Sequence, residues 1–477
     1  MRARQSVLSS LVPFLARRPL AIVAFGILSS GCATYQSSDS TQNIDLRYQA
    51  GDYAVLAESI ENQLKLVDSE TGELLAVTPS NNILLHLEAA ESWRLTGNKE
   101  RSIEHYDVIE TLFKDEDTEG FGKKIAEGIG AVLVNDSVRS YEPPPAERIL
   151  TNFYKALSFW SSGELDNARV EFNRANERAR IAVESYQKMI EKEQEKNEKD
   201  DGANKNLHSD GVQKALAQNF PNIEYWEVFD SFVNPAVAYI NSIFLAHGPS
   251  ADVSKAETLM QRVSGMIGDN TLINEDLLNL RQHGRLTNGK PQRWIIFESG
   301  LSPVYGEKKF SIPWITPNAL IQVSVALPEL IDRPSGMGVN GLAIDNQALE
   351  FLPFARMDMV MRTEFKKRWP ATVSRAVVSA ATKAVLQDQM GRKFGVLGNL
   401  AGTVYANASA SADTRAWHAM PEQWSLAKVS AQQESSLRIP YGNGEYKEVM
   451  LPANKNTLIY IKQPTPHAAP LVEMFYL

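Results

Sequence analysis

Cysteine is almost absent from this chain, because Cys32 is the only one among 477 residues. An intramolecular disulfide framework is therefore excluded. The seven histidines are scattered without paired spacing and no C-x-x-C motif is present, so we expect no structural metal site. A G-x-S-x-G nucleophile motif is also missing. These absences remove the catalytic and metal-binding classes that are easiest to recognise from sequence.

Positively charged residues are also fewer than negatively charged ones. The chain carries 57 Asp and Glu against 49 Lys and Arg, a formal net charge of −8, and it contains no basic tract. We therefore expect no nucleic-acid partner. The run Gly336-x-Gly338-x-x-Gly341 fits a dinucleotide pattern, but a strand-like segment follows it where that motif requires a helix. A hairpin loop is the better interpretation, and no cofactor is expected.

One apolar run, Leu20–Ala33, is shorter than the ~20 residues that a transmembrane helix needs. It follows four arginines with no acidic residue among them, and it ends in small residues before Cys32. This order predicts a secretory signal peptide over residues 1–31, with lipidation of Cys32. The end of the run resembles the lipobox of bacterial lipoproteins, although Ser29 stands where that motif usually has Leu. Signal cleavage without lipidation is the alternative.

The lipobox resemblance implies that Cys32 becomes an acylated first residue holding the protein to a membrane. Several acyl chains together anchor a protein almost permanently, since each buried CH₂ contributes ~0.8 kcal/mol. Ala33, where some lipoproteins have Asp, implies sorting to the outer membrane, facing the periplasm. The polar residues that follow, within 32–45, have the composition of a tether.

Helical periodicity begins near Tyr48, and four pairs of helical segments are each separated by a glycine. The glycines are Gly51, Gly97, Gly163 and Gly248. A glycine can take the positive φ that such a turn requires, and the pattern is typical of tetratricopeptide-like (TPR-like) repeats. Their spacing is uneven and longer than the ~34 residues of a regular array. We therefore expect an irregular TPR-like α-helical solenoid over residues 46–288.

The pattern changes at residue 289, where the chain starts to show short apolar or alternating runs. The predicted strands are Trp294–Phe297, Ile321–Val325, Leu342–Ile344, Ala348–Leu352, Trp424–Val429, Leu437–Ile439, Val449–Leu451 and Leu458–Ile461. Small residues at helical spacing over Val373–Val385, followed by Gly391–Ala412, predict a helical hairpin insert. The expected fold class is thus α+β and multidomain, with an α+β domain over residues 289–477 containing a sheet or sandwich.

Two polar clusters are candidate sites. Asp413, Arg415, Trp417 and His418 suit recognition of a carboxylate or sugar, although a capped helix end with an internally paired Arg is the simpler interpretation. The second cluster consists of Glu147, Arg148, Arg169, Glu171 and Arg174. Glu171 and Arg174 lie one helical turn apart and can pair, so an ion network inside the domain is favoured over a binding site.

Several stretches resemble a family of bacterial envelope lipoproteins with TPR-like N-terminal halves. They are Leu133–Asp136, Glu147-Arg148, Tyr154–Leu157, Ala168–Ala175, Asn234–Tyr239, Gly300–Pro303 and Ala412–Trp417 before Pro421. The resemblance spans nearly the whole chain after the signal. It implies architecture and an envelope location, and it implies no particular activity.

Three classes of function stay open at this point. The first is a membrane-anchored scaffold that binds an envelope protein through helical hairpins without catalysis. The second is an enzyme or binding protein acting on peptidoglycan or glycan through Asp413–His418, for which the usual pair of carboxylates is not apparent. The third is an oligomeric structural component of the envelope, in which the faces of small residues in Val373–Ala412 pack between subunits.

Overall fold

The computed structural model describes residues 43–68, 70–77, 82–118, 141–198, 206–226, 234–247, 250–315, 320–333, 341–382 and 411–477. The predicted signal peptide, Cys32 and residues 32–42 of the predicted tether lie outside this part, as does Gly248. Residues 43–45, which were also assigned to the tether, belong to a first helix over residues 43–50.

The chain before residue 289 is helical wherever it is described, apart from turns and one isolated bridge. Its helices are α2 (Tyr53–Gln63), α3 (Ile83–Thr96), α4 (Lys99–Thr118), α6 (Pro145–Ser161), α7 (Leu165–Glu198), α9 (Asp210–Asn219), the short 3₁₀ helix η3 (Ile223–Tyr225), α10 (Pro235–Ala246), α11 (Ser250–Ile267) and α12 (Thr271–His283).

The predicted turns between paired helices are confirmed at three glycines. Gly51, Gly97 and Gly163 have φ angles of 79°, 89° and 82°, in the left-handed region that glycine adopts without steric cost. At Gly97 the backbone N–H bonds back to the carbonyl of Arg94, which ends α3 before α4 begins. These turns fold α3 against α4 and α6 against α7.

The strands begin where the composition changes. They are β1 (Gln292–Ser299), β2 (Val304–Ile315), β3 (Leu320–Ile331), β4 (Ala343–Ile344), β5 (Gln347–Ala348), β6 (Leu352–Arg356), β7 (Gln423–Ser430), β8 (Ser435–Tyr441), β9 (Glu445–Leu451), β10 (Thr457–Gln463) and β11 (Leu471–Tyr476). An additional helix covers residues 357–382 and contains the start of the predicted helical insert. The predicted second part of that insert lies almost entirely outside the described residues. The α+β class is therefore confirmed.

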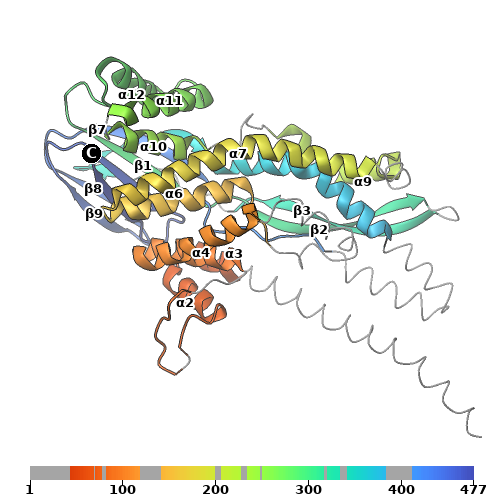
Figure 1. Cartoon of the computed structure of the whole chain (residues 1–477). Helices are drawn as coiled ribbons and strands as arrows, with labels where there is room; N and C mark the ends of the chain where they lie inside the picture. Colours follow the sequence, from red (N-terminus) through yellow and green to blue (C-terminus); the bar gives the residue numbers. More distant parts are fainter. Residues whose placement is uncertain are drawn as a thin grey trace, which may run out of the picture.

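Three sheets are present in the described chain. A mixed five-stranded sheet has the order β11-β10-β1-β7-β6, with β1 and β10 parallel and the other neighbours antiparallel. A four-stranded sheet has the order β5-β4-β8-β9, and β2 and β3 form a separate hairpin. The strands β2 and β11 were not foreseen from the sequence. Figure 1 shows helices α6 and α10 lying across the five-stranded sheet, with β8 and β9 on its other side.

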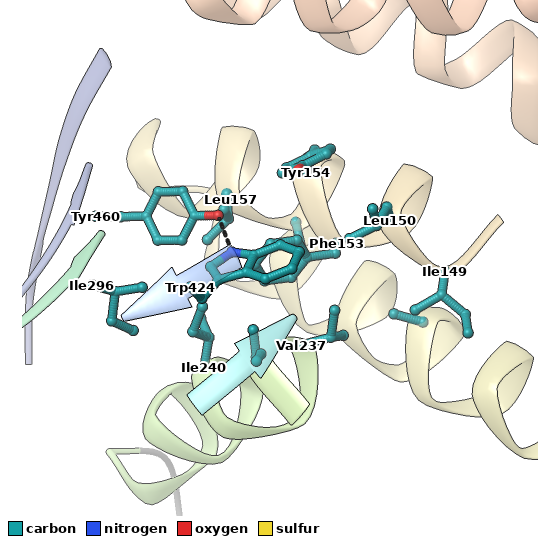
Figure 2. Close-up of a cluster of buried hydrophobic side chains, with 14 of the residues drawn as sticks. Ile149, Leu150, Phe153, Tyr154, Leu157, Val237, Ile240, Ile296, Trp424 and Tyr460 are labelled. Atoms are coloured by element: carbon teal, nitrogen blue, oxygen red, sulfur yellow. Dashed lines mark hydrogen bonds between the residues drawn. The ribbon is translucent and has the colours of Figure 1, made fainter. Parts of the chain in front are cut away.

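Strand alternation divides the five-stranded sheet between two cores. Trp294 and Ile296 of β1 face the helices, whereas Ile295 and Phe297 face the four-stranded sheet. On the helical side, Phe153 of α6 and Trp424 of β7 belong to the cluster that Figure 2 shows. All residues of α10 are buried there. We call this layered unit of helices and two sheets the body.

A second region extends away from the body in Figure 1. It consists of the β2–β3 hairpin, α9 and the helix over 357–382, and we call it the arm. The first residues of that helix, Met357, Val360 and Met361, still pack in the core of the body. Its core is a separate cluster of buried side chains, namely Val212, Leu216, Ile312, Trp314, Val323, Val325, Leu327, Val373, Val377, Ala380 and Ala381. The body and the arm therefore have different interiors.

Candidate functional site

The four residues of the first predicted cluster do not form one site. Asp413 and Arg415 pair with each other, with Arg415 Nη2 2.7 Å from Asp413 Oδ2, and both remain partly exposed. Trp417 and His418 are instead buried between the helices and the sheet. The internally paired arginine favoured on sequence grounds is thus present, and Trp417 lies edge-on to Tyr154 rather than beside Arg415.

His418 is fixed by a residue from the other end of the chain. Its backbone N–H donates to Glu88 Oε1 of α3 at 2.8 Å, and its ring atom Nδ1 lies 2.8 Å from the same oxygen. Both side chains are almost completely buried. The imidazole therefore contributes to the contact between α3 and the segment before β7.

Glu147 connects the two predicted clusters. This residue lies in the first turn of α6, and its Oε1 accepts a hydrogen bond from the backbone N–H of Trp417 at 3.1 Å. Its Oε2 accepts a 2.6 Å hydrogen bond from the Tyr141 hydroxyl. Burial raises the pKa of Glu147 to about 8, and the nearby carboxyl groups of Glu364 and Glu88 add to the shift. Glu147 therefore keeps its proton near neutral pH.

Glu364 is the second carboxyl group at this point. It lies on the helix over 357–382 and accepts a hydrogen bond from the backbone N–H of Ala146 at 3.1 Å, at the N-terminus of α6. Burial raises the pKa of Glu364 to about 7. Glycan hydrolysis usually requires a pair of carboxyl groups. Both are at most 1 % exposed, however, so a sugar could reach them only if the fold opened.

The remaining members of the second cluster point to several different partners. Glu171 and Arg174 form the expected pair at 2.6 Å, and Glu171 also binds Lys155 at 3.0 Å. Arg169 pairs with Asp252 of α11 instead of with its predicted neighbours. The Arg148 guanidinium lies over the Phe113 ring, 4.4 Å from its centre. These contacts hold α4, α6, α7 and α11 together.

The most extensive polar network was not foreseen from the sequence. Glu298 of β1 forms an ion pair with Lys462 of β10 at 2.6 Å, and Lys462 also forms an ion pair with Glu91 of α3 at 2.9 Å. Arg94 of α3 pairs with Glu91 at 2.9 Å and with Glu473 of β11 at 2.7 Å. All five side chains are at most 1 % exposed.

Three tyrosines complete this network. We call the five charged side chains and these three tyrosines the buried charge network. The Tyr154 hydroxyl of α6 donates to Glu298 Oε1 at 2.7 Å, and Tyr106 of α4 donates to Glu91 Oε2 at 2.9 Å. Tyr460 of β10 also donates to Glu298 and in turn accepts from the Trp424 indole at 3.1 Å, the bond drawn in Figure 2. Burial would raise the pKa of Glu91, but Arg94 and Lys462 lower it overall, so this carboxylate stays charged.

A sequence signal for this network does exist. Glu298, Lys462 and Glu473 each stand in an otherwise mainly apolar strand, at the alternate position that faces the helices. A charged side chain is almost never buried without a partner. Three such residues in separate strands therefore indicate an internal ion network, even though the sequence does not say which residues pair.

A further polar group lies at α2, α3 and α4. Glu61 accepts hydrogen bonds from Trp93 and Arg101, each at 2.7 Å, and lies 3.0 Å from His105. Burial would raise the pKa of Glu61, but these hydrogen bonds lower it to about 2. Burial and the neighbouring His105 lower the pKa of His86 to about 3. Within the described residues, no group of three or more His, Cys, Asp and Glu has the arrangement of a metal site.

No protein-family model, curated protein or solved structure matches this chain. None of the helices in the described part is long and apolar enough to cross a bilayer. The functional interpretation therefore depends on the residues themselves. Their arrangement joins helices to a sheet: charged side chains from α3, β1, β10 and β11, together with a tyrosine hydroxyl from α6, contact one another in an interior that solvent does not reach.

Proposed function

We propose that the protein is a membrane-anchored cell-envelope lipoprotein that binds another envelope protein without catalysing a reaction. The signal-like residues 1–31 and the lipidation pattern at Cys32 support the anchor. The outer membrane, on its periplasmic side, is the location that Ala33 favours. The resemblance to envelope lipoproteins supports the same location.

The proposal that the protein does not catalyse a reaction is supported by one observation: the predicted site residues are already in contact with other groups of the same chain. Each charged residue of the two predicted clusters contacts another side chain or a backbone group of the same chain. Glu147 and His418 are also buried. These groups therefore serve the fold, and a partner would be recognised by surfaces outside the clusters.

The irregular TPR-like solenoid belongs to this proposal, because the helical hairpins α3/α4 and α6/α7 support it. Helices α6 and α10 lie against the sheet, which leaves the outer face of α7 as the candidate surface. Val170 and Ile181 are exposed on that face, three helical turns apart. A long helix with spaced apolar residues suits an extended protein partner.

Metabolic labelling with a fatty acid tests the anchor. We expect label on the wild-type protein and none on a Cys32→Ala variant, with the wild type in the membrane fraction. An unlabelled wild-type protein in the soluble fraction would remove the anchor from the proposal. This experiment does not depend on which partner is bound.

Photo-crosslinking in intact cells tests the partner surface. A photoreactive amino acid in place of Ile181 is expected to yield one defined adduct with another envelope protein. The same amino acid in place of Leu278, which is exposed on α12, is the matched control. Equal patterns at both positions would contradict a binding role for α7. Adducts between two copies of the chain would favour the oligomeric alternative instead.

A further inference from the structure

The β2–β3 hairpin of the arm has one covered face and one open face. Strands β2 and β3 pair over twelve residues each, from Val304 opposite Ile331 at the base to Ile315 opposite Leu320 at the far end. Alternate side chains such as Ile312 and Val323 pack against α9 and the helix over 357–382. Figure 1 shows the far end pointing away from the body.

The far end of the hairpin is apolar and uncharged. Ile315 is 62 % exposed and Leu320 is 66 % exposed, although both are large aliphatic side chains. The sequence contains no charged residue from Phe310 to Pro328. Charged side chains are found closer to the base, where Lys309 pairs with Glu307 at 3.0 Å. We call Ile315 and Leu320 the hairpin tip.

The edges of the hairpin disfavour pairing with another strand. Asn206 bonds both the N–H and the C=O of Ile315, at 2.9 and 3.1 Å, which shows that these groups point outward. By strand alternation and register, Pro313 and Pro328 also occupy outward positions. Proline has no N–H to offer there and protects an edge from strand addition. A partner of the apolar tip is therefore expected to be of another kind than an added strand.

The start of the described chain lies at the base of the same hairpin. Asp45 forms a 2.9 Å ion pair with Arg333, which follows the last residue of β3 by two positions. Asn43 lies eleven residues after Cys32. An extended segment of that length reaches about 40 Å, and a twelve-residue strand is also about 40 Å long. A lipid at Cys32 can thus lie in the same plane as the hairpin tip.

We propose that the hairpin tip inserts into the headgroup region of the membrane that holds the lipid of Cys32. This inference rests on the lipid anchor of the proposed function. The protein then contacts the bilayer at two places, so that the arm stands upright on the membrane and the body is held away from it. Exposed Ile and Leu side chains gain most from such shallow burial, because no charged neighbour on the hairpin must be desolvated.

Crosslinking to lipid tests this proposal. The chain from residue 32 onward is coupled through its single cysteine to a maleimide lipid in phosphatidylethanolamine and phosphatidylglycerol vesicles. This coupling supplies the anchor whether or not cells acylate Cys32, so the two proposals fail independently. A benzophenone amino acid replaces Ile315, or, as the matched control, Met450, which is 57 % exposed on β9 in the body.

We expect phospholipid adducts from position 315 and at least about tenfold fewer from position 450. Adding Leu320→Asp should reduce the adducts at position 315 about tenfold, since a carboxylate resists insertion. Circular dichroism checks that this variant folds, and a Leu320→Ala variant gives an intermediate yield. Equal lipid yields at the two positions, no adducts at position 315, or adducts there only between two protein copies would each overturn the proposal.

Discussion

The body and the arm are stabilised by different kinds of interior. In the body, Glu91, Arg94, Glu298, Lys462 and Glu473 are buried together between the helices and the sheet. The core of the arm consists of valine, alanine and a few larger apolar side chains, and the buried carboxyl group of Glu364 lies at the end of the arm that meets α6. A buried ion pair accepts few substitutions, whereas an apolar core tolerates many. The comparison teaches that pairing in the body is specific and that packing in the arm is adaptable.

Removal of one charge from the body should have the largest effect on stability. A Lys462→Met substitution leaves Glu298 and Glu91 in an interior with too few cations. We expect the free energy of unfolding to fall by about 4 to 5 kcal/mol, as is typical when one partner of a buried pair is lost. Urea unfolding followed by far-UV circular dichroism measures this loss.

An exposed pair provides the control for that substitution. Arg281 and Glu257 lie 3.1 Å apart on α12 and α11, and both are about two-fifths exposed. Arg281→Met should change the free energy of unfolding by less than about 0.5 kcal/mol, because water already solvates both charges. Equal losses for the two variants would show that the buried charge network is no more important than a surface pair.

The pH dependence of stability should be the next largest effect. Glu147 keeps its proton in the folded protein up to about pH 8, whereas the unfolded chain loses it near its ordinary pKa of 4.5. The folded state then binds the extra proton, so the free energy of unfolding falls as the pH rises from 4.5 to 8. Between pH 5 and pH 8.5 the fall attributable to Glu147 is about 4 kcal/mol, because the slope reaches 1.4 kcal/mol per pH unit only well between the two pKa values.

A Glu147→Gln variant keeps the shape of the side chain but cannot ionise. Its free energy of unfolding, measured in urea at pH 5 and at pH 8.5, should differ less between the two values than that of the wild type. Asp413→Asn is the matched control, because Asp413 is partly exposed and paired with Arg415. If both variants retain the wild-type slope, Glu147 is charged in the folded protein.

A substitution in the arm should have a smaller effect that stays within the arm. Val377→Ala removes two methylene equivalents from a fully buried position, which lowers stability by about 2 kcal/mol. Because the arm core is separate, hydrogen exchange should accelerate in β2, β3 and α9, and hardly at all in β1 and β10. Faster exchange throughout both regions would show that the arm and the body unfold together.

The helical turns should give the smallest effect. Gly163 has a φ of 82° and open space around its Cα, so a Gly163→Ala variant meets strain but no steric overlap. We expect a loss of about 1 kcal/mol, measured by thermal unfolding. Gly265 lies inside α11 and also has open space, and there Ala should be neutral or stabilising. A loss at Gly265 as large as that at Gly163 would contradict this account of the turn.

Local patterns allowed much of the secondary structure to be predicted. The turns at Gly51, Gly97 and Gly163 and strands such as β1, β7 and β10 follow from periods of 3.6 and 2. Strand β2 was missed because glycine, charged residues and a proline interrupt its alternation. Strand β2 forms because it packs against α9 and the helix over 357–382. Both lie far from it in the sequence, so a local pattern does not reveal this contact.

The partners of the candidate site residues were the least predictable. His418 meets Glu88, 330 positions earlier in the chain, and Trp417 meets Glu147, 270 positions earlier. Glu171 and Arg174 were paired correctly because they are three residues apart on one helix. Spacing predicts neighbours on a helix, but contacts between distant segments depend on the complete topology.

The ion pair between Arg94 and Glu473 has a consequence for how the protein is made. These residues are separated by 379 positions, and β1 pairs in parallel with β10 from the far end of the chain. During synthesis α3 is made long before β11. The Arg94 guanidinium therefore has no contact with Glu473 until the segments between them have also been made. We therefore expect this contact to form late in synthesis, and we expect shorter chains to expose a charged, unfinished surface on which chaperones and proteases can act.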